Sequence, residues 1–312
     1  MRVTQVSSGE GARSLQWSPD SKKLVYSAIS IPSTLSVVDL SEGLDRPQGY
    51  LVDQYDGEGN AFTARGATYS RDLVIWSKDS TRFYYEHFNR YYAYDLDEPE
   101  RQRIPIHPEG ERTNVYALYE MPDDILAIVA VLPEDETISL HVIDAGILPP
   151  AAPVKVFPTG NEERALLGVN SRRGFHALSP SGTKLVFSAS GRAIADPSQL
   201  FVADFTDGIP TVAEPAYPVH DVVAEGGGAF PNPFWGFQWA AGDRLVFRAA
   251  LPGDAAFDLY YVDCSRSGSC SAPYLINVDT RQGEQRIYSF AISDDGRHLA
   301  YIQDLDLDGR TD

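Results

Sequence analysis

The stretch LQWSPDSKKLVYSA, residues 15–28, is compatible with two local structures. Ser18 followed by Pro19 is typical of a helix start, because serine is a good N-cap and proline fits the first helical turn. The same residues suit a type I β-turn, with proline at the second position and the side chains of Ser18 and Asp20 bonded back to the main chain. A single copy does not decide between helix and hairpin, so the decision depends on whether the pattern recurs.

The pattern occurs six times along the chain. Each copy has an apolar anchor residue, a polar turn containing Pro, Asp or Gly, and an apolar residue that opens a segment rich in β-branched and aromatic side chains. The copies are WSPDSKKL (17–24), WSKDSTRF (76–83), YEMPDDIL (119–126), LSPSGTKL (178–185), WAAGDRLV (239–246) and ISDDGRHL (292–299). Apolar residues at helical spacing do not follow the proline, so each copy is predicted to be a hairpin turn between strands.

A second motif follows five of the copies. It is an apolar segment with an aspartate near its end, in the versions LSVVDL, YYAYDL, LHVIDA, LFVADF and LYYVDC. The spacing between copies leaves room for four strands each, and helical patterns are nearly absent. The sequence therefore predicts an all-β fold, a six-bladed β-propeller formed as one domain by residues 1–312. The anchors Trp17, Trp76 and Trp239 are expected to be buried between blades.

A propeller ring usually closes by pairing strands from the two ends of the chain. The segment VTQV, residues 3–6, precedes the first copy and is expected to be the closing strand of the last blade. The last copy is not followed by the segment that contains the aspartate, because the sequence ends at Asp312. The last blade is therefore expected to be truncated at its C-terminal end.

The pattern WSPDSKKLVYSA…LSVVDL resembles the repeats of TolB-like β-propellers, and also those in the propeller of prolyl-oligopeptidase-type peptidases. The six copies extend this resemblance over essentially the whole chain. The TolB-like resemblance implies a periplasmic or extracellular scaffold that binds a protein or peptide partner and has no catalytic activity. TolB itself has an N-terminal α/β domain, which residues 1–14 cannot supply. The peptidases carry catalysis on a separate α/β-hydrolase domain, and this sequence has no G-x-S-x-G nucleophile motif.

The charge of the chain excludes several classes of partner. Asp and Glu number 44 against 26 Lys and Arg, a net charge of −18, which argues against binding to nucleic acid or to anionic membranes. No apolar run reaches the roughly 20 residues of a membrane helix, so membrane insertion is not expected. The first residues lack the apolar core of a signal peptide, which leaves either a cytosolic protein or a mature exported chain with a supplied Met1. The chain is expected to be a monomer.

The two cysteines lie in DCSRSGSC, with five turn-forming residues between them. Cys264 and Cys270 either close a small disulfide loop or remain two free thiols. A metal site is not expected, because no second Cys or His pair lies nearby. The disulfide is the preferred interpretation; it implies an oxidising compartment and a role in holding a hairpin together.

An aromatic stretch, GGGAFPNPFWGFQW, covers residues 226–239. Its prolines keep the first part out of a regular strand. If exposed, its rings would form a platform for a ligand, whereas the alternative is that most of them pack between blades. Trp235 is the best candidate for an exposed ring. The candidate ligand-binding residues are Phe230, Phe234, Trp235 and Phe237.

The terminal stretch DLDLDGRTD has the spacing of a calcium-binding loop. Alternate carboxylates would converge on one ion, glycine allows the sharp turn, and an arginine supplies its main-chain carbonyl. The candidate calcium ligands are Asp304, Asp306, Asp308, Arg310 and Asp312. The alternative is a solvated acidic hairpin. If calcium binds, a lactonase-like, calcium-dependent propeller hydrolase is the alternative function, although the equivalent positions of the innermost strands supply no carboxylate.

Overall fold

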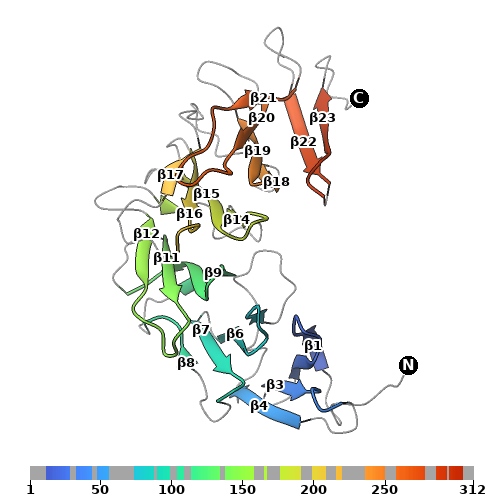
Figure 1. Cartoon of the computed structure of the whole chain (residues 1–312), viewed down its shortest axis with the longest axis vertical. Helices are drawn as coiled ribbons and strands as arrows, with labels where there is room; N and C mark the ends of the chain where they lie inside the picture. The colour runs from blue at the N-terminus through green and yellow to red at the C-terminus, as the bar shows by residue number, and fades with distance from the viewer. Residues whose placement is uncertain are drawn as a thin grey trace. The chain divides into compact units, whose positions relative to one another are not determined.

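The computed structural model describes residues 12–28, 33–43, 48–55, 74–87, 90–98, 104–108, 114–133, 138–157, 165–166, 176–190, 199–208, 216–219, 236–249, 258–277, 286–293 and 295–304. Every regular element among these residues is a β-strand (Figure 1). In this part of the chain, no helix has the length and apolar character needed to cross a membrane. The predicted all-β class is confirmed.

The described strands form six antiparallel sheets that succeed one another along the chain. Sheet 1 contains β1 (Ala12–Trp17), β2 (Lys23–Ala28), β3 (Ser33–Asp39) and β4 (Gln48–Tyr55). Sheet 2 contains β5 (Ile75–Trp76), β6 (Arg82–His87), β7 (Arg90–Asp95) and β8 (Ile104–Pro105). Sheet 3 contains β9 (Asn114–Glu120), β10 (Ile125–Val131), β11 (Ser139–Asp144) and β12 (Val154–Phe157).

The later sheets repeat this order. Sheet 4 contains β13 (Ala165–Leu166), β14 (His176–Leu178), β15 (Lys184–Ser190), β16 (Gln199–Asp204) and β17 (Ala216–Pro218), and both β13 and β14 pair with β15. Sheet 5 contains β18 (Phe237–Ala240), β19 (Arg244–Ala249), β20 (Asp258–Asp263) and β21 (Tyr274–Leu275). Sheet 6 contains β22 (Arg286–Ile292) and β23 (Leu299–Asp304) among the described residues.

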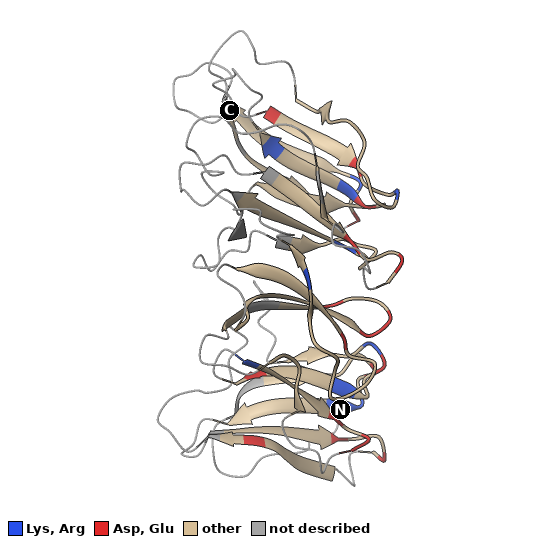
Figure 2. Ribbon diagram, turned by 90° about the vertical axis from the view of Figure 1, so that its left-hand side faces the viewer, with Lys and Arg blue, Asp and Glu red and all other residues tan. Residues whose placement is uncertain are grey.

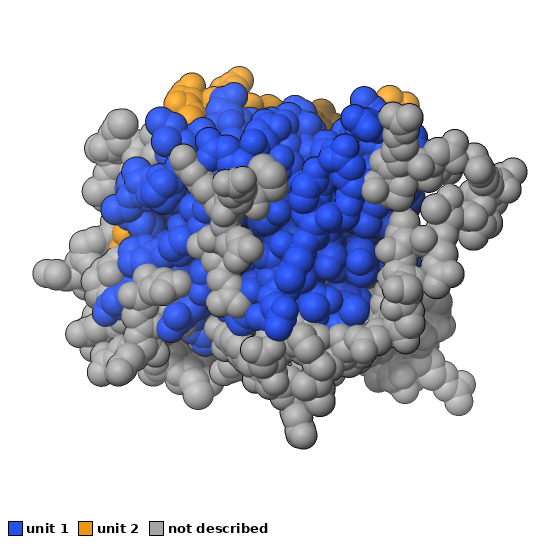
Figure 3. All heavy atoms as spheres, turned by 90° about the horizontal axis from the view of Figure 1, so that it is seen from below, with its two compact units in different colours: residues 1–136, 142–154 blue, residues 137–141, 155–312 orange. Residues whose placement is uncertain are grey.

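The chain divides into two compact units, residues 1–136 with 142–154 and residues 137–141 with 155–312 (Figure 3). In the first unit, one core lies between sheets 1 and 2 and includes Val37 and Phe83. In the second unit, one core lies between sheets 4 and 5 and includes Val202 and Phe247. Consecutive sheets therefore bury apolar side chains against each other within each unit, which is the main stabilising contribution to such a fold.

The turn after β1 shows why residues 15–28 form a hairpin. The Ser18 N–H donates to the Lys23 carbonyl at 2.9 Å, and the Lys23 N–H donates to Ser18 Oγ at 2.9 Å. The Ser18 hydroxyl also donates to Asp20 Oδ1 at 2.5 Å. One serine side chain thus satisfies main-chain and side-chain groups on both sides of the turn, and the predicted hairpin is confirmed.

The same serine-centred turn recurs in three other copies. Ser77, Ser179 and Ser293 each accept a hydrogen bond from the N–H of the residue five positions later. Each turn also places one residue in the left-handed region of φ, and these residues are Ser21, Ser80, Gly182 and Gly296. The recurrence explains why serine, an acidic or hydroxyl residue, and a small residue keep the same spacing in four copies.

The turns of copies 3 and 5 are one residue shorter. Trp239 pairs with Leu245 across the β18–β19 hairpin, whereas Trp17 pairs with Leu24 across β1–β2. In copy 3, Leu126 pairs with Glu120, and Tyr119 pairs with Ala127. The predicted anchor Tyr119 is therefore wrong by one position, because the shorter turn puts Glu120 at the place that tryptophan holds in copy 5.

The left-handed turn position gives a test of this geometry. A Cβ atom added at Gly296 would lie 2.2 Å from the main-chain nitrogen of Ala241, and the φ of Gly296 is 66°. Gly296→Ala is expected to lower the free energy of unfolding by about 2–3 kcal/mol in urea denaturation, from overpacking and left-handed strain. Ser21→Gly, at the equivalent position, should leave stability unchanged or raise it by up to about 1 kcal/mol. Equal effects of the two substitutions would contradict the equivalence of the turns.

The repeated aspartates have a structural role. Each accepts a hydrogen bond from the N–H two residues later, at distances of 2.7–3.0 Å, and these aspartates are Asp39, Asp95, Asp144, Asp204 and Asp263. In sheets 1, 2, 4 and 5 the residue opposite the aspartate is basic, namely Lys23, Arg82, Lys184 and Arg244. In each unit, acidic residues accordingly concentrate in the turns at one end of the strands (Figure 2).

The three anchor tryptophans differ in burial. Trp76 is 6% exposed and packs in the core that sheet 2 shares with sheet 1. Trp239 is half-buried, and its Nε1 donates to the Ala177 carbonyl of sheet 4 at 2.9 Å. Trp17 is 52% exposed, so the described sheets do not provide the burial that was expected for it. The reason is positional: the other two indoles pack against the sheet that precedes theirs in the chain, and no described sheet precedes sheet 1.

Candidate functional site

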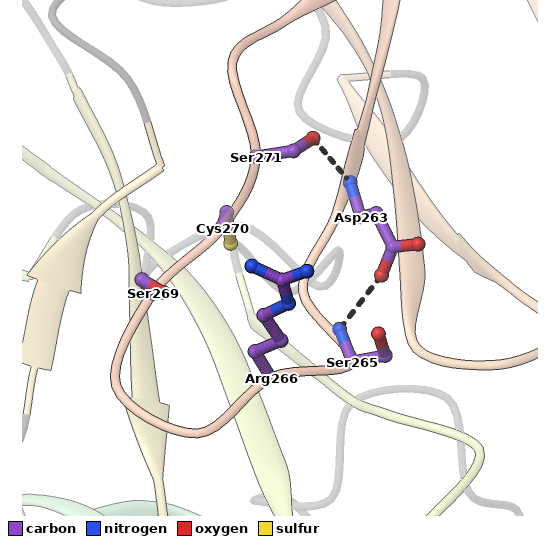
Figure 4. Close-up of a pocket in the computed structure, with 6 residues that line it drawn as sticks. All are labelled: Asp263, Ser265, Arg266, Ser269, Cys270 and Ser271. Carbon is purple, nitrogen blue, oxygen red and sulfur yellow. Dashed lines mark hydrogen bonds between the residues drawn. The ribbon is translucent and has the colours of Figure 1, made fainter.

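A polar pocket of about 320 Å³ lies beside the Cys264–Cys270 disulfide (Figure 4). Its lining residues are the last residue of β20 and five residues of the connection between β20 and β21. They are Asp263, Ser265, Arg266, Ser269, Cys270 and Ser271. The volume is at the lower end of the range for small-ligand sites, so the pocket suits a small polar group.

The connection is folded by its own short-range bonds. The predicted disulfide is confirmed, and Cys264 is fully buried. The Ser265 N–H donates to Asp263 Oδ1 at 2.9 Å, and the Asp263 N–H donates to Ser271 Oγ at 2.9 Å (Figure 4). The two ends of the connection are therefore joined both covalently and by hydrogen bonds, which fixes the shape of the pocket.

A buried ion pair of sheet 4 holds the middle of the same connection. Lys184, 1% exposed, donates from Nζ to Asp204 Oδ2 at 2.7 Å and to the Arg266 carbonyl at 3.0 Å. Asp204 Oδ2 also accepts the Gly268 N–H at 3.0 Å. Burial raises the pKa of Asp204, but hydrogen bonds from Lys184, Thr206 and Gly268 outweigh that effect and hold the pKa below its ordinary value.

Arg266 supplies the positive charge of the pocket. Its side chain extends into the pocket (Figure 4), and no residue in the described part of the chain accepts a hydrogen bond from its guanidinium. Hydrogen bonding from Ser265, followed by the charges of Arg244 and Arg266, holds the pKa of Asp263 below its ordinary value. An available guanidinium, a carboxylate and several hydroxyls are groups that can recognise a polar ligand by charge and hydrogen bonds.

The predicted aromatic platform is described at one of its four residues. Phe237 is 7% exposed, pairs with Phe247 across β18–β19, and contributes to the core between sheets 4 and 5. It thus has the packing role that the sequence left open as an alternative. Phe230, Phe234 and Trp235 lie outside the described residues.

The predicted calcium loop is described only at Asp304, which ends β23 opposite Arg286. Asp306, Asp308, Arg310 and Asp312 lie outside the described residues, as does the predicted closing strand at residues 3–6.

Calcium binding stays a prediction: millimolar Ca²⁺ should raise the melting temperature weakly, and Asp306→Ala should abolish that gain. Asp20→Ala, in an unrelated turn, serves as the matched control. A gain that survives Asp306→Ala would place the ion elsewhere.

The pocket was not predicted as a site. The sequence predicted the disulfide, but only as a means of holding a hairpin. The signal available in the sequence was an arginine among serines inside a small disulfide ring. Such a ring restricts the backbone of Arg266 and therefore the directions in which its side chain can extend. What the sequence did not show is the contact of this ring with Lys184 and Asp204, which lie far away along the chain.

Solved structures with similar folds include large enzymes and a propeller domain. This chain is similar to part of the crystal structure of Porphyromonas gingivalis dipeptidyl peptidase 4, with a TM-score of 0.56 and 10% identity, over 99% of this chain and 46% of that one. The Swd1 β-propeller domain from Myceliophteria thermophila gives a TM-score of 0.43 and 13% identity, over 97% of this chain and 82% of that one. Prolyl oligopeptidase B from Galerina marginata gives a TM-score of 0.45 and 13% identity, over 94% of this chain and 38% of that one. No family model and no curated protein matches the sequence.

Successive antiparallel sheets of about four strands, packed face to face on their neighbours in the chain, are the architecture of propellers. The chain has a β-propeller fold. At 10% identity, the likeness to dipeptidyl peptidase 4 concerns the fold alone, and the chain spans less than half the length of that enzyme.

Proposed function

We propose that this chain is a six-bladed, TolB-like β-propeller that acts as a monomeric, non-enzymatic binding scaffold in the periplasm or outside the cell. The observation that carries the proposal is the Cys264–Cys270 disulfide, which shapes a polar pocket in an exposed connection of sheet 5. Structural disulfides persist in oxidising compartments, which supports an extracytoplasmic location. A rigid, polar concavity on a propeller supports the binding of a protein or peptide partner.

The six blades are proposed to close into a ring through sheets 1 and 6. In sheet 5, Trp239 donates to the carbonyl of Ala177, which directly precedes the anchor of copy 4. The equivalent residue of copy 6 is Ala291, which is exposed, as is Trp17. Closure would let Trp17 repeat this contact with β22, while the segment at residues 3–6 adds a strand to the last blade.

Site-specific photo-cross-linking tests the binding function. A photo-reactive amino acid in place of Ser269 would sit on the pocket wall, and Ser41, in the matching connection of sheet 1, provides the control position. In the organism's own extracytoplasmic compartment, we expect a protein or peptide adduct from position 269 and none from position 41. Equal labelling at both positions, or free thiols at Cys264 and Cys270 in the native protein, would contradict the proposal.

A second candidate function is favoured by the comparison with dipeptidyl peptidase 4. This chain aligns over nearly its full length with less than half of that structure. Together with the resemblance of the repeats to peptidase propellers, this supports a role as the propeller part of a peptidase. Peptide release from a mixture of synthetic peptides by the full native protein, blocked by a serine-reactive inhibitor, would favour this candidate over the non-enzymatic scaffold.

A further inference from the structure

Arg266 is held by its main chain while its side chain remains available. The Arg266 carbonyl accepts the buried Lys184 ammonium at 3.0 Å, and the neighbouring Ser265 N–H donates to Asp263. The guanidinium, in contrast, has no acceptor among the described residues and extends into a pocket of about 320 Å³. Because the backbone that carries this guanidinium is already fixed, ligand binding needs to order the Arg266 side chain but not the connection itself.

The chemistry of the ligand follows from the guanidinium and from the charges around it. A planar guanidinium binds best to oxyanions that accept two parallel hydrogen bonds, which favours carboxylates and phosphates. Besides Asp204, whose charge Lys184 offsets, two carboxylates belong to this region: Asp263 lines the pocket, and Asp207 Oδ2 lies 3.4 Å from Ser267 Oγ. Their repulsion grows with the charge of the ligand, so a monoanion is favoured over a phosphate dianion.

We propose that this pocket binds a single carboxylate group of a peptide, with Arg266 as the charged contact and the Ser269 hydroxyl as a hydrogen-bond donor. The proposal rests on the proposed function as a binding scaffold and names the chemistry that the scaffold recognises. A peptide can present a carboxylate at its C terminus or on an Asp or Glu side chain, and the experiment separates these two sources.

Isothermal titration on the oxidised, full chain provides the test. The probes are acetyl-Gly-Ser-Ala with a free C terminus, the same peptide as its C-terminal amide, acetyl-Gly-Asp-Ala amide, and inorganic phosphate. We expect the free C terminus or the Asp peptide to bind, and the uncharged amide and phosphate to bind at least about tenfold more weakly. Whichever of the free-C-terminus peptide and the Asp peptide binds more tightly identifies the source of the carboxylate.

Two matched substitutions assign the binding to Arg266. Arg266→Gln removes the charge but keeps the carbonyl that Lys184 holds, so the fold of the connection should persist, as an unchanged melting temperature would show. Arg297→Gln changes an exposed arginine in the turn of sheet 6. We expect Arg266→Gln to weaken binding of the carboxylate probe about tenfold or more, and Arg297→Gln to leave it unchanged.

Several results would overturn the proposal. They are no binding of either carboxylate probe, equal binding of the uncharged amide, tighter binding of phosphate, or equal effects of the two substitutions. Each of these would leave the scaffold function standing if position 269 still forms a specific cross-link. Loss of that cross-link together with carboxylate binding that depends on Arg266 would instead remove the macromolecular partner and retain the site.

Discussion

Replacing Lys184 with methionine is expected to lower the free energy of unfolding by about 3–5 kcal/mol at pH 7. Methionine retains most of the apolar length of the side chain, so the substitution chiefly removes the charge. Asp204 would then lose the ammonium that lies 2.7 Å from its Oδ2, and the Arg266 carbonyl would lose its donor. An uncompensated, largely buried carboxylate is among the most destabilising defects that one substitution can create. Urea denaturation followed by tryptophan fluorescence measures the effect.

The loss should depend on pH in a defined direction. The pKa of Asp204 in the folded protein lies below its ordinary value of 3.8, so its stabilising effect is fully present above that value and is lost as the pH falls through the folded pKa. The difference between the two proteins should therefore be largest near neutral pH and shrink below about pH 4. Lys22→Met, at an exposed position, should change stability by no more than about 0.5 kcal/mol. A small difference that does not vary with pH would contradict the role of this ion pair.

The hairpins could be predicted from sequence because their determinants are local. The side chains of Ser18 and Asp20 bond to groups within five residues of themselves, so the turn forms its own hydrogen bonds wherever the motif occurs. The same holds for the aspartates that end the third strands, although their function in turns became visible only from their hydrogen bonds. Because each copy of the motif predicts one more sheet, the number of copies predicts a fold built from repeated sheets.

The pocket could not be predicted because its determinants are remote. The position of Arg266 depends on Lys184 and Asp204, which belong to a different sheet, and no periodic pattern links these residues. The register error in copy 3 has a related cause. Glu120 and Tyr119 both suit a strand, and only the cross-strand pairing with Leu126 shows which of them occupies the anchor position.

The burial of the tryptophans also depends on remote neighbours. The sequence predicts the same environment for Trp17, Trp76 and Trp239, because their motifs are alike. Their exposure differs because the indole in this position needs a preceding sheet to pack against. The local sequence pattern therefore predicts that an indole lies on this face of each sheet. Whether the indole is buried depends on whether another sheet packs against that face.

Ring closure is expected to have its largest effect on the stability that is lost when Trp17 is replaced. If sheets 1 and 6 adjoin as proposed, Trp17→Ala should lower the free energy of unfolding by about 3–5 kcal/mol, as expected for a buried indole. A tryptophan that stays 52% exposed should instead tolerate the substitution with a change near 0.5 kcal/mol. The size of the loss in urea denaturation therefore reports directly on whether another sheet covers this face.

Trp76 provides the matched control, because it holds the same position in sheet 2 and is 6% exposed. Trp76→Ala should cost about 3–5 kcal/mol whether or not the ring closes. Iodide quenching gives an independent readout: with closure, Trp17 should be nearly as protected as Trp76, and a variant that retains only Trp17 should show this directly. Strong quenching of Trp17 together with a small loss of stability in Trp17→Ala would exclude closure against this face, since Leu15 beside it would also remain exposed to solvent.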